Sequence, residues 1–133
     1  MDSAEEMAAV RTLLVADDDP EVRRIVGSAA RKQGLRVIEA EDGERALRLI
    51  REEKPDVVVL DIIMPKRDGR DVCRLVRADP AFKDVAIILF TAKDNQSDRV
   101  SGLQVGADDY ITKPFRIDML MRRIEHLLWK RQA

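Results

Sequence analysis

The chain has 133 residues, 45% hydrophobic and 37% charged, which is typical of one globular domain. Its net charge of −1 argues against direct nucleic acid binding. The single cysteine fits a reducing compartment, and no apolar run approaches the ~20 residues of a membrane span. We therefore expect a cytoplasmic protein without a membrane contact.

The first elements follow from apolar runs and turn residues. Residues 1–10 are small and acidic, and we expect them to form an N-terminal arm. Residues 12–16 are continuously apolar, which predicts a strand buried on both faces. The sequence Asp-Asp-Asp-Pro follows at 17–20, and its proline suits the first position of a helix that ends near Gly34.

The rest of the chain continues to alternate strand and helix patterns. Further strands are expected at 35–40, 57–60, 85–90 and 108–112, and further helices at 42–53, 68–79, 95–105 and 117–130. Five strand–helix pairs predict an α/β fold, a three-layer sandwich with five parallel strands and five helices. The fully apolar first and third strands favour the doubly wound strand order 2-1-3-4-5.

Polar residues follow four of the predicted strands: Asp17 with Asp18, Asp61, Thr91 and Lys113. The carboxyl ends of parallel strands share one edge, so these side chains should form one pocket. Three crowded carboxylates repel each other unless cations compensate. Lys113 supplies one positive charge, and Mg²⁺, which prefers oxygen ligands, is the natural second cation. A carboxylate, Mg²⁺, an ammonium and a hydroxyl are the groups that phosphoryl transfer needs.

Taken singly, each of these residues has a simpler interpretation. Asp17 and Asp18 are also ordinary acids for a helix N-terminus, and Asp61 also suits a turn or a helix cap. Thr91 also suits a strand end, and Lys113 a solvated loop. Their joint arrival at one sheet edge favours the functional interpretation.

The motifs then resemble those of a known family. They are Asp17-Asp18, Leu60-Asp61 with Met64-Pro65, Asp68-Gly69, Phe90-Thr91-Ala92, and Tyr110 with Lys113-Pro114-Phe115. In this order and spacing the chain resembles the receiver domain of two-component response regulators, and we assign residues 11–131 to that domain. The resemblance implies a CheY-like, flavodoxin-like fold.

The resemblance also implies roles for the acidic residues. Asp61 would accept a phosphoryl group from a phosphohistidine of a sensor histidine kinase or a histidine phosphotransfer protein. Asp18 and Asp61 would bind Mg²⁺ directly, Asp17 would bind it through water, and Ile63 would contribute its backbone carbonyl. By this resemblance the chain is a signalling domain that catalyses only its own phosphorylation and dephosphorylation, and not an enzyme.

The remaining motif residues would form the switch. Lys113 would pair with the phosphoryl oxygens, with a cis peptide bond to Pro114. Thr91 would hydrogen-bond the phosphoryl group and draw Tyr110 inward. The face made by the 95–105 helix, the 108–112 strand and the 117–130 helix would then control an output domain or a downstream protein.

Residues 98–115 resemble the branch whose outputs are winged-helix transcription factors, in which this face forms a symmetric dimer, whereas the pattern of residues 73–85 is equally common in receivers with other outputs. Asp109 and Arg123 could supply one ion pair between subunits. Met119, however, stands where Arg99 would need an acid. We therefore expect at most a weak or phosphorylation-dependent homodimer.

Three other functions fit the sequence less well. A phosphohydrolase with an aspartate nucleophile usually carries a second acid two residues later, where this chain has Ile63. An adaptor with a receiver fold but without phosphorylation would lack site residues, and here all of them are present. A nucleotide-binding domain would need a Gly-rich phosphate loop after the first strand, and this chain has none there.

Overall fold

A computed structural model describes residues 10–92 and 105–132 of the chain. In chain order the elements are β1 (Thr12–Ala16), α2 (Pro20–Lys32), β2 (Arg36–Ala40), α3 (Gly43–Glu53), β3 (Val57–Asp61), α4 (Gly69–Ala78), the short 3₁₀ helix η1 (Pro80–Phe82), β4 (Ala86–Ala92), β5 (Asp109–Lys113) and α6 (Ile117–Gln132).

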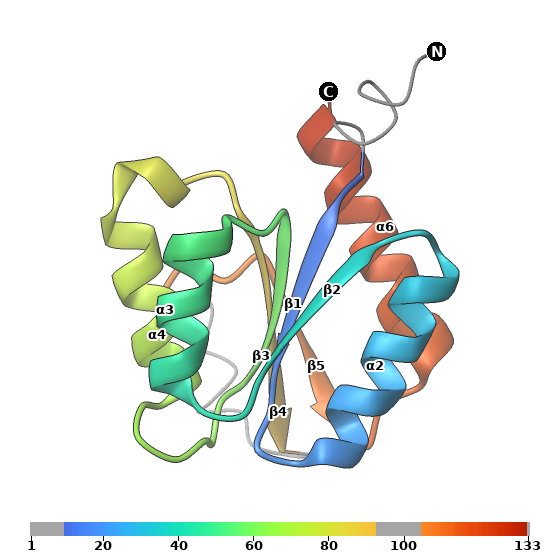
Figure 1. Ribbon diagram of the computed structural model, residues 1–133, viewed down its shortest axis with the longest axis horizontal. Helices are drawn as coiled ribbons and strands as arrows, with labels where there is room; N and C mark the ends of the chain where they lie inside the picture. Colours follow the sequence, from blue (N-terminus) through green and yellow to red (C-terminus); the bar gives the residue numbers. More distant parts are fainter. Residues whose placement is uncertain (1–9, 93–104, 133) are drawn as a thin grey trace.

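All five strands are parallel and lie in the order β2-β1-β3-β4-β5, which confirms the predicted order. Helices α3 and α4 cover one face of the sheet, and α2 and α6 cover the other (Figure 1). This arrangement is the expected three-layer α/β sandwich. It places the carboxyl ends of all five strands at one edge, called here the carboxyl edge.

The apolar runs of the central strands are buried because both faces of the sheet are covered. Every residue of β1 is buried, and so are the first four residues of β3. Along β1, Leu14 packs in the cluster beneath α3 and α4, whereas Leu13 and Val15 pack beneath α2 and α6. Strict alternation of polar and apolar residues is therefore missing from these strands.

Aspartates at the predicted turns start three of the helices. The carboxylates of Asp19, Asp42 and Asp68 accept hydrogen bonds from the first backbone N–H groups of α2, α3 and α4, respectively, at 2.9, 2.8 and 2.7 Å. Each satisfies an N–H group that the helix itself leaves unpaired. Gly34, with φ of +86°, follows the end of α2 in a conformation that favours glycine.

Some boundaries differ from the prediction. Strand β5 begins and ends one residue later than expected, and at its start the Asp108 carboxylate accepts the Ile87 N–H in place of a backbone carbonyl. The segment after α4 forms η1, which the sequence predicted only as a helix end. Four of the five expected helices lie within the described residues, and the 95–105 helix lies almost entirely outside them. The expected arm is also almost wholly outside them.

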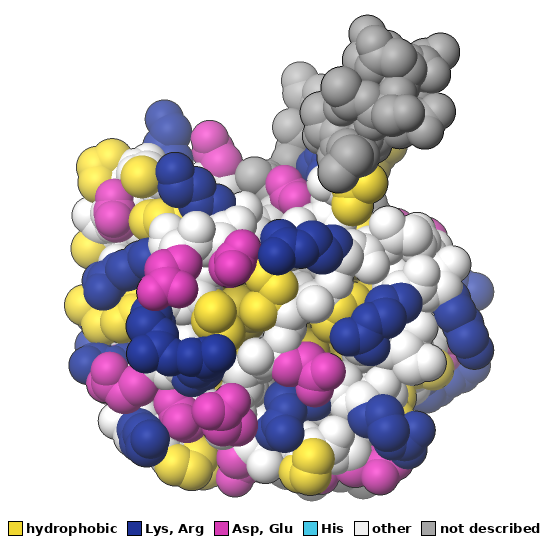
Figure 2. Space-filling model, viewed as in Figure 1, with side chains coloured by type: hydrophobic (Ala, Val, Ile, Leu, Met, Phe, Trp, Pro, Cys, Tyr) yellow, Lys and Arg dark blue, Asp and Glu magenta, His cyan; other side chains and the backbone are white. Residues whose placement is uncertain are grey.

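The described surface mixes charges of both signs. On the face shown in Figure 2, basic and acidic side chains alternate around small apolar areas, as expected for a chain with nearly balanced charge. Among the described helices, none combines the length and the apolar character needed to cross a membrane.

Candidate functional site

The polar residues predicted to converge do meet at the carboxyl edge of the sheet. Asp17 directly follows β1, Asp61 ends β3 and Lys113 ends β5, whereas Thr91 lies one residue before the end of β4. The strand register places Asp61 opposite Phe90, and Thr91 opposite Thr112. Parallel pairing therefore brings residues from four separate segments into one site.

Lys113 holds two of the carboxylates. Its Nζ donates hydrogen bonds to Asp17 Oδ2 at 2.7 Å and to Asp61 Oδ2 at 3.2 Å. The Asp17 side chain is 0% exposed, so its charge lacks the screening that water gives a surface pair. The second Asp17 oxygen, Oδ1, accepts the backbone N–H of Asp19 at 3.0 Å. Both oxygens of this buried acid thus have a donor.

Asp18 completes an acidic cluster with these two residues. One carboxylate oxygen from each of Asp17, Asp18 and Asp61 lies within 4.8 Å of the others. Asp17 is buried, Asp61 is half-buried and Asp18 is exposed, so the cluster opens to solvent on the Asp18 side. Oxygen ligands at this spacing fit a hard divalent cation such as Mg²⁺.

The local electrostatics shift two pKa values. Burial, followed by the negative charge of Asp17, raises the pKa of Asp61 to about 6, although Lys113 acts in the opposite direction. For Lys113, burial lowers the pKa, but the hydrogen bond to Asp17 and the charge of Asp61 outweigh it. The net pKa of Lys113 is therefore raised. Lys113 stays protonated near pH 7, and added positive charge would favour the ionised form of Asp61.

The loop after β3 is packed tightly around Asp61. Ile62 donates its N–H to the Phe90 carbonyl (3.0 Å), and Gly69 donates its N–H to the Ile62 carbonyl (2.8 Å). A Cβ atom on Gly69 would lie 2.2 Å from the Asp61 carbonyl oxygen, so only glycine fits there. Ile63 donates its N–H to Asp61 Oδ1 (3.3 Å), and its side chain is 68% exposed.

The two predicted switch residues lie on neighbouring strands, Thr91 near the end of β4 and Tyr110 on β5. Thr91 is buried. Tyr110 is partly buried, and its side chain packs against the apolar cluster on the α3 and α4 side of the sheet. The peptide bond between Lys113 and Pro114 is cis, as the resemblance implied.

Sequence reasoning missed two supports of the site. The rings of Phe90 and Phe115 stack with centroids 4.7 Å apart, and the Lys113 ammonium lies 5.6 Å from the Phe90 centroid. Phe115 belongs to the Lys113-Pro114-Phe115 motif, which was the available signal. Arg23 donates to the Asp17 carbonyl oxygen at 2.7 Å, and only the helical position of Arg23, one turn into α2, could have suggested this contact.

Two residues expected at the proposed dimer face contact each other within the chain. Arg123 and Asp109, which were expected to pair between subunits, form an ion pair and hydrogen bond within one chain. Strand β5 and helix α6 are close enough for this pair to form without a second subunit. Arg99, which was expected to take part in the same face, lies outside the described residues.

Comparison with known proteins agrees with this geometry. The response regulator receiver domain family matches residues 13–125. A relative from Guillardia theta, described as "Probable transcriptional regulator ycf27", is 46% identical over 116 residues, which are 87% of this chain and 44% of the relative. The chain spans a little under half the length of the first curated relatives, 44% to 49%.

Two solved structures represent the structural likeness. The chemotaxis response regulator CheY4 of Vibrio cholerae superimposes with a TM-score of 0.84 at 26% identity, covering 90% of this chain and 99% of CheY4. The receiver domain of the sensor histidine kinase PA1611 from Pseudomonas aeruginosa PAO1 has a magnesium ion coordinated in its active site cleft. It gives a TM-score of 0.82 at 32% identity and covers 90% of this chain and 98% of that domain.

The family match spans most of the chain, and both the CheY-like fold and the acidic cluster at the carboxyl edge agree with it. This chain therefore belongs to the response regulator receiver domain family of two-component signalling.

Proposed function

We propose that this domain accepts a phosphoryl group on Asp61 from the phosphohistidine of a sensor histidine kinase or a histidine phosphotransfer protein. The observation that carries the proposal is the Lys113 ammonium, hydrogen-bonded to Asp61 at 3.2 Å and to Asp17 at 2.7 Å in one acidic cluster. A cation fixed beside a carboxylate is positioned to hold the oxygens of an incoming phosphoryl group.

Each residue has a defined task in this transfer. An Asp61 carboxylate oxygen attacks phosphorus and forms the new P–O bond. The P–N bond to the donor imidazole breaks, and the leaving nitrogen keeps the electron pair. The pKa of Asp61, about 6, leaves its nucleophilic, ionised form in the majority at pH 7. Lys113 then pairs with the phosphoryl oxygens, and the Thr91 hydroxyl donates a hydrogen bond to one of them.

The metal ligands in this proposal are Asp18, Asp61 and the backbone carbonyl of Ile63, with Asp17 acting through water. When bound, Mg²⁺ supplies positive charge that offsets the repulsion between the phosphoryl oxygens and the acidic cluster. The cluster itself supports this assignment, since three carboxylate oxygens meet within 4.8 Å.

The domain is proposed to act as a signalling switch, not as an enzyme with a separate substrate. It would catalyse only its own phosphorylation and dephosphorylation, in the cytoplasm. The output partner is an output domain or downstream protein that contacts β5, α6 and residues 95–105. Similarity to a relative described as a probable transcriptional regulator favours an output that regulates transcription, without DNA contacts from the receiver itself. Any homodimer through this face should be weak before phosphorylation.

The proposal is tested with acetyl phosphate as a small phosphodonor, and intact-mass spectrometry as the readout. We expect wild-type protein to gain one phosphoryl group only when Mg²⁺ is present. Asp61→Asn should gain none, whereas Asp118→Asn, which alters an exposed acid on α6, should label like the wild type. Equal labelling of Asp61→Asn and wild type would refute the proposal.

A further inference from the structure

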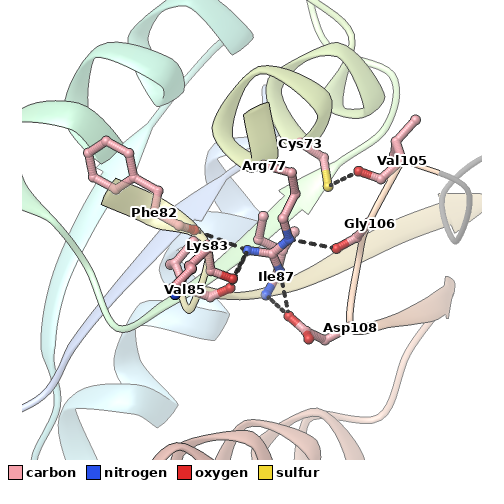
Figure 3. A network of polar contacts seen from close by, with 9 residues as sticks. All are labelled: Cys73, Arg77, Phe82, Lys83, Val85, Ile87, Val105, Gly106 and Asp108. Carbon is pink, nitrogen blue, oxygen red and sulfur yellow. Dashed lines mark hydrogen bonds and ion pairs between the residues drawn. The ribbon is translucent and has the colours of Figure 1, made fainter. Parts of the chain in front are cut away.

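Arg77, in the last turn of α4, reaches the chain segment that leads into β5 (Figure 3). Its Nε donates a hydrogen bond to the Gly106 carbonyl and its Nη2 to the Asp108 carboxylate, both at 2.8 Å. Its Nη1 donates to the carbonyl of Val85, just before β4, at 2.7 Å. One largely buried side chain therefore joins α4 to the segments just before the N-terminal ends of two neighbouring strands, β4 and β5.

Asp108 in turn fixes the first contact between β4 and β5. Its backbone N–H donates to the Ile87 carbonyl at 2.9 Å, and its carboxylate accepts the Ile87 N–H at 2.7 Å. In a regular parallel ladder that N–H would bond to a backbone carbonyl of the neighbouring strand. Here the Asp108 carboxylate takes this place, and the nearby Gly106 carbonyl accepts from Arg77.

Gly106 is fitted to Arg77. Its φ of +98° lies in the region that favours glycine, and a Cβ atom would lie 2.9 Å from Arg77 Cγ. The backbone at residue 106 thus packs directly on the Arg77 side chain. The segment that leads into β5 therefore packs around the Arg77 side chain.

The pairing register of β5 against β4 depends on contacts outside the strand itself, such as those of Arg77. Strand β5 is an edge strand that pairs only with β4, and all but one of its residues are half-buried. A slip by two residues would keep every side chain on its own face of the sheet. It would also carry Lys113 about 7 Å along the strand, well beyond the 2.7 Å and 3.2 Å contacts that Lys113 makes with the acidic cluster.

We propose that Arg77 is a positioning residue for Lys113. By binding Gly106 and Asp108 it sets the register of β5 against β4, and the register places the Lys113 ammonium beside Asp17 and Asp61. Arg77 lies at the opposite edge of the sheet, since Asp108 precedes Lys113 by five residues, about 16 Å of strand. The inference rests on the proposed function only in the part that concerns phosphorylation.

The variants for the test differ in what they remove. Arg77→Met removes all the guanidinium donors and keeps an apolar stem, and Arg77→Lys keeps the charge without the planar fork. Arg74→Met is the matched control, because Arg74 lies on the same helix and its ion pair among the described residues is with nearby Asp71 on an exposed surface. Each protein is first checked for cooperative unfolding in urea.

Cys73 provides a readout of the segment that leads into β5, and this readout does not depend on phosphorylation. It is the only cysteine, it is fully buried, and its Sγ lies 3.5 Å from the Val105 carbonyl (Figure 3). Its reaction with a disulfide reagent such as DTNB therefore requires an opening that exposes Cys73, and loss of the Arg77 contacts with Gly106 and Asp108 should make that opening more frequent. We expect Arg77→Met to react at least about tenfold faster than wild type, and Arg74→Met within about twofold. Amide exchange should rise in β5 but not in β1 or β3.

The second readout separates positioning from general destabilisation. Labelling by acetyl phosphate should slow about tenfold in Arg77→Met, whereas the Kd for Mg²⁺ should rise less than about twofold, because the metal-binding acids lie directly after β1 and at the end of β3. Arg77→Lys should give values between those of wild type and Arg77→Met in every readout. If Arg77→Met does not fold, the same measurements on Arg77→Lys test the proposal.

Wild-type values of Cys73 reactivity and β5 exchange in the Arg77 variants would overturn the register role. A loss of Mg²⁺ affinity equal to the loss in labelling would overturn the positioning role, since it would indicate a general disturbance of the site. If wild-type protein takes no label at all, the proposed function fails, while the Cys73 and exchange readouts still decide whether Arg77 sets the register.

Discussion

Lys113 Nζ lies 2.7 Å from Asp17 Oδ2, and this contact joins the last residue of β5 to the residue that follows β1. Because Asp17 is fully buried, the ammonium is part of the fold as well as part of the candidate site. Removing it leaves a buried carboxylate without its counter-charge.

We predict that Lys113→Met lowers the free energy of unfolding of the metal-free protein by about 3 kcal/mol, the typical cost of breaking a buried ion pair. Millimolar Mg²⁺ should recover part of this loss, since the metal ion supplies positive charge to the same cluster. Urea unfolding with and without Mg²⁺ measures both effects. Lys130→Met, at an exposed position of α6, is the control, and equal losses in the two variants would contradict the prediction.

The raised pKa of Asp61 predicts a pH-dependent stability. Its folded-state pKa of about 6 exceeds the ordinary value of 3.8, so the folded state binds this proton more tightly than the unfolded chain does. The stabilising contribution of that proton is full below pH 3.8 and is lost as the pH rises through 6. In EDTA, Asp61→Asn should therefore stabilise the protein by on the order of 2 kcal/mol at pH 8 and by much less at pH 4.

Asp17→Asn serves as the contrast. Both Asp17 oxygens accept from donors, Lys113 and the Asp19 N–H, so an amide NH₂ group would face one of them. This variant should be less stable than wild type at both pH values. Thermal unfolding at pH 4 and pH 8 distinguishes the two variants, and a stability gain in Asp17→Asn at pH 8 would mean that the two hydrogen bonds to Asp17 do not stabilise the fold.

Gly69 offers a test of the packing around Asp61. A Cβ atom there would lie 2.2 Å from the Asp61 carbonyl oxygen, a backbone atom that cannot move aside cheaply. Gly69→Ala should cost at least about 2 kcal/mol and should slow labelling of Asp61.

Gly27→Ala is the matched control, because its Cβ would meet the flexible end of Arg31 at 3.3 Å inside helix α2. It should leave labelling unchanged, and its stability should be unchanged or higher by up to about 1 kcal/mol. Chemical denaturation and the labelling rate measure both variants. Similar losses in the two would mean that the close approach at Gly69 is unimportant.

The exposed side chain of Ile63 predicts a long-lived phosphorylated state. Ile63 has no hydrogen-bonding atom in its side chain, so it cannot orient a water molecule for attack on phosphorus. We predict that Ile63→Asn loses its phosphoryl group about tenfold faster than wild type after donor removal, with Ile63→Val decaying like wild type. Unchanged or slower decay of Ile63→Asn would contradict this.

The sequence predicted the strands and the site residues because local patterns encode both. Continuous apolar runs marked the strands, and parallel pairing then placed Asp17, Asp61 and Lys113 at one edge. The contacts of Arg77 could not be predicted in this way, because they join a helix to residues about thirty positions later that carry no local signal. The later start of β5 was also not predictable from local patterns, since the side chain of Asp108 replaces a backbone acceptor there.

The central claim is that Asp61, and not a neighbouring acid, carries the phosphoryl group. Protein labelled with acetyl phosphate and Mg²⁺ can be reduced with borohydride, which converts an aspartyl phosphate to homoserine, and then mapped by peptide mass spectrometry. Asp61 should be converted, while Asp17 and Asp18 should remain aspartate. Homoserine at Asp17 or Asp18, or at no position despite labelling, would contradict the account.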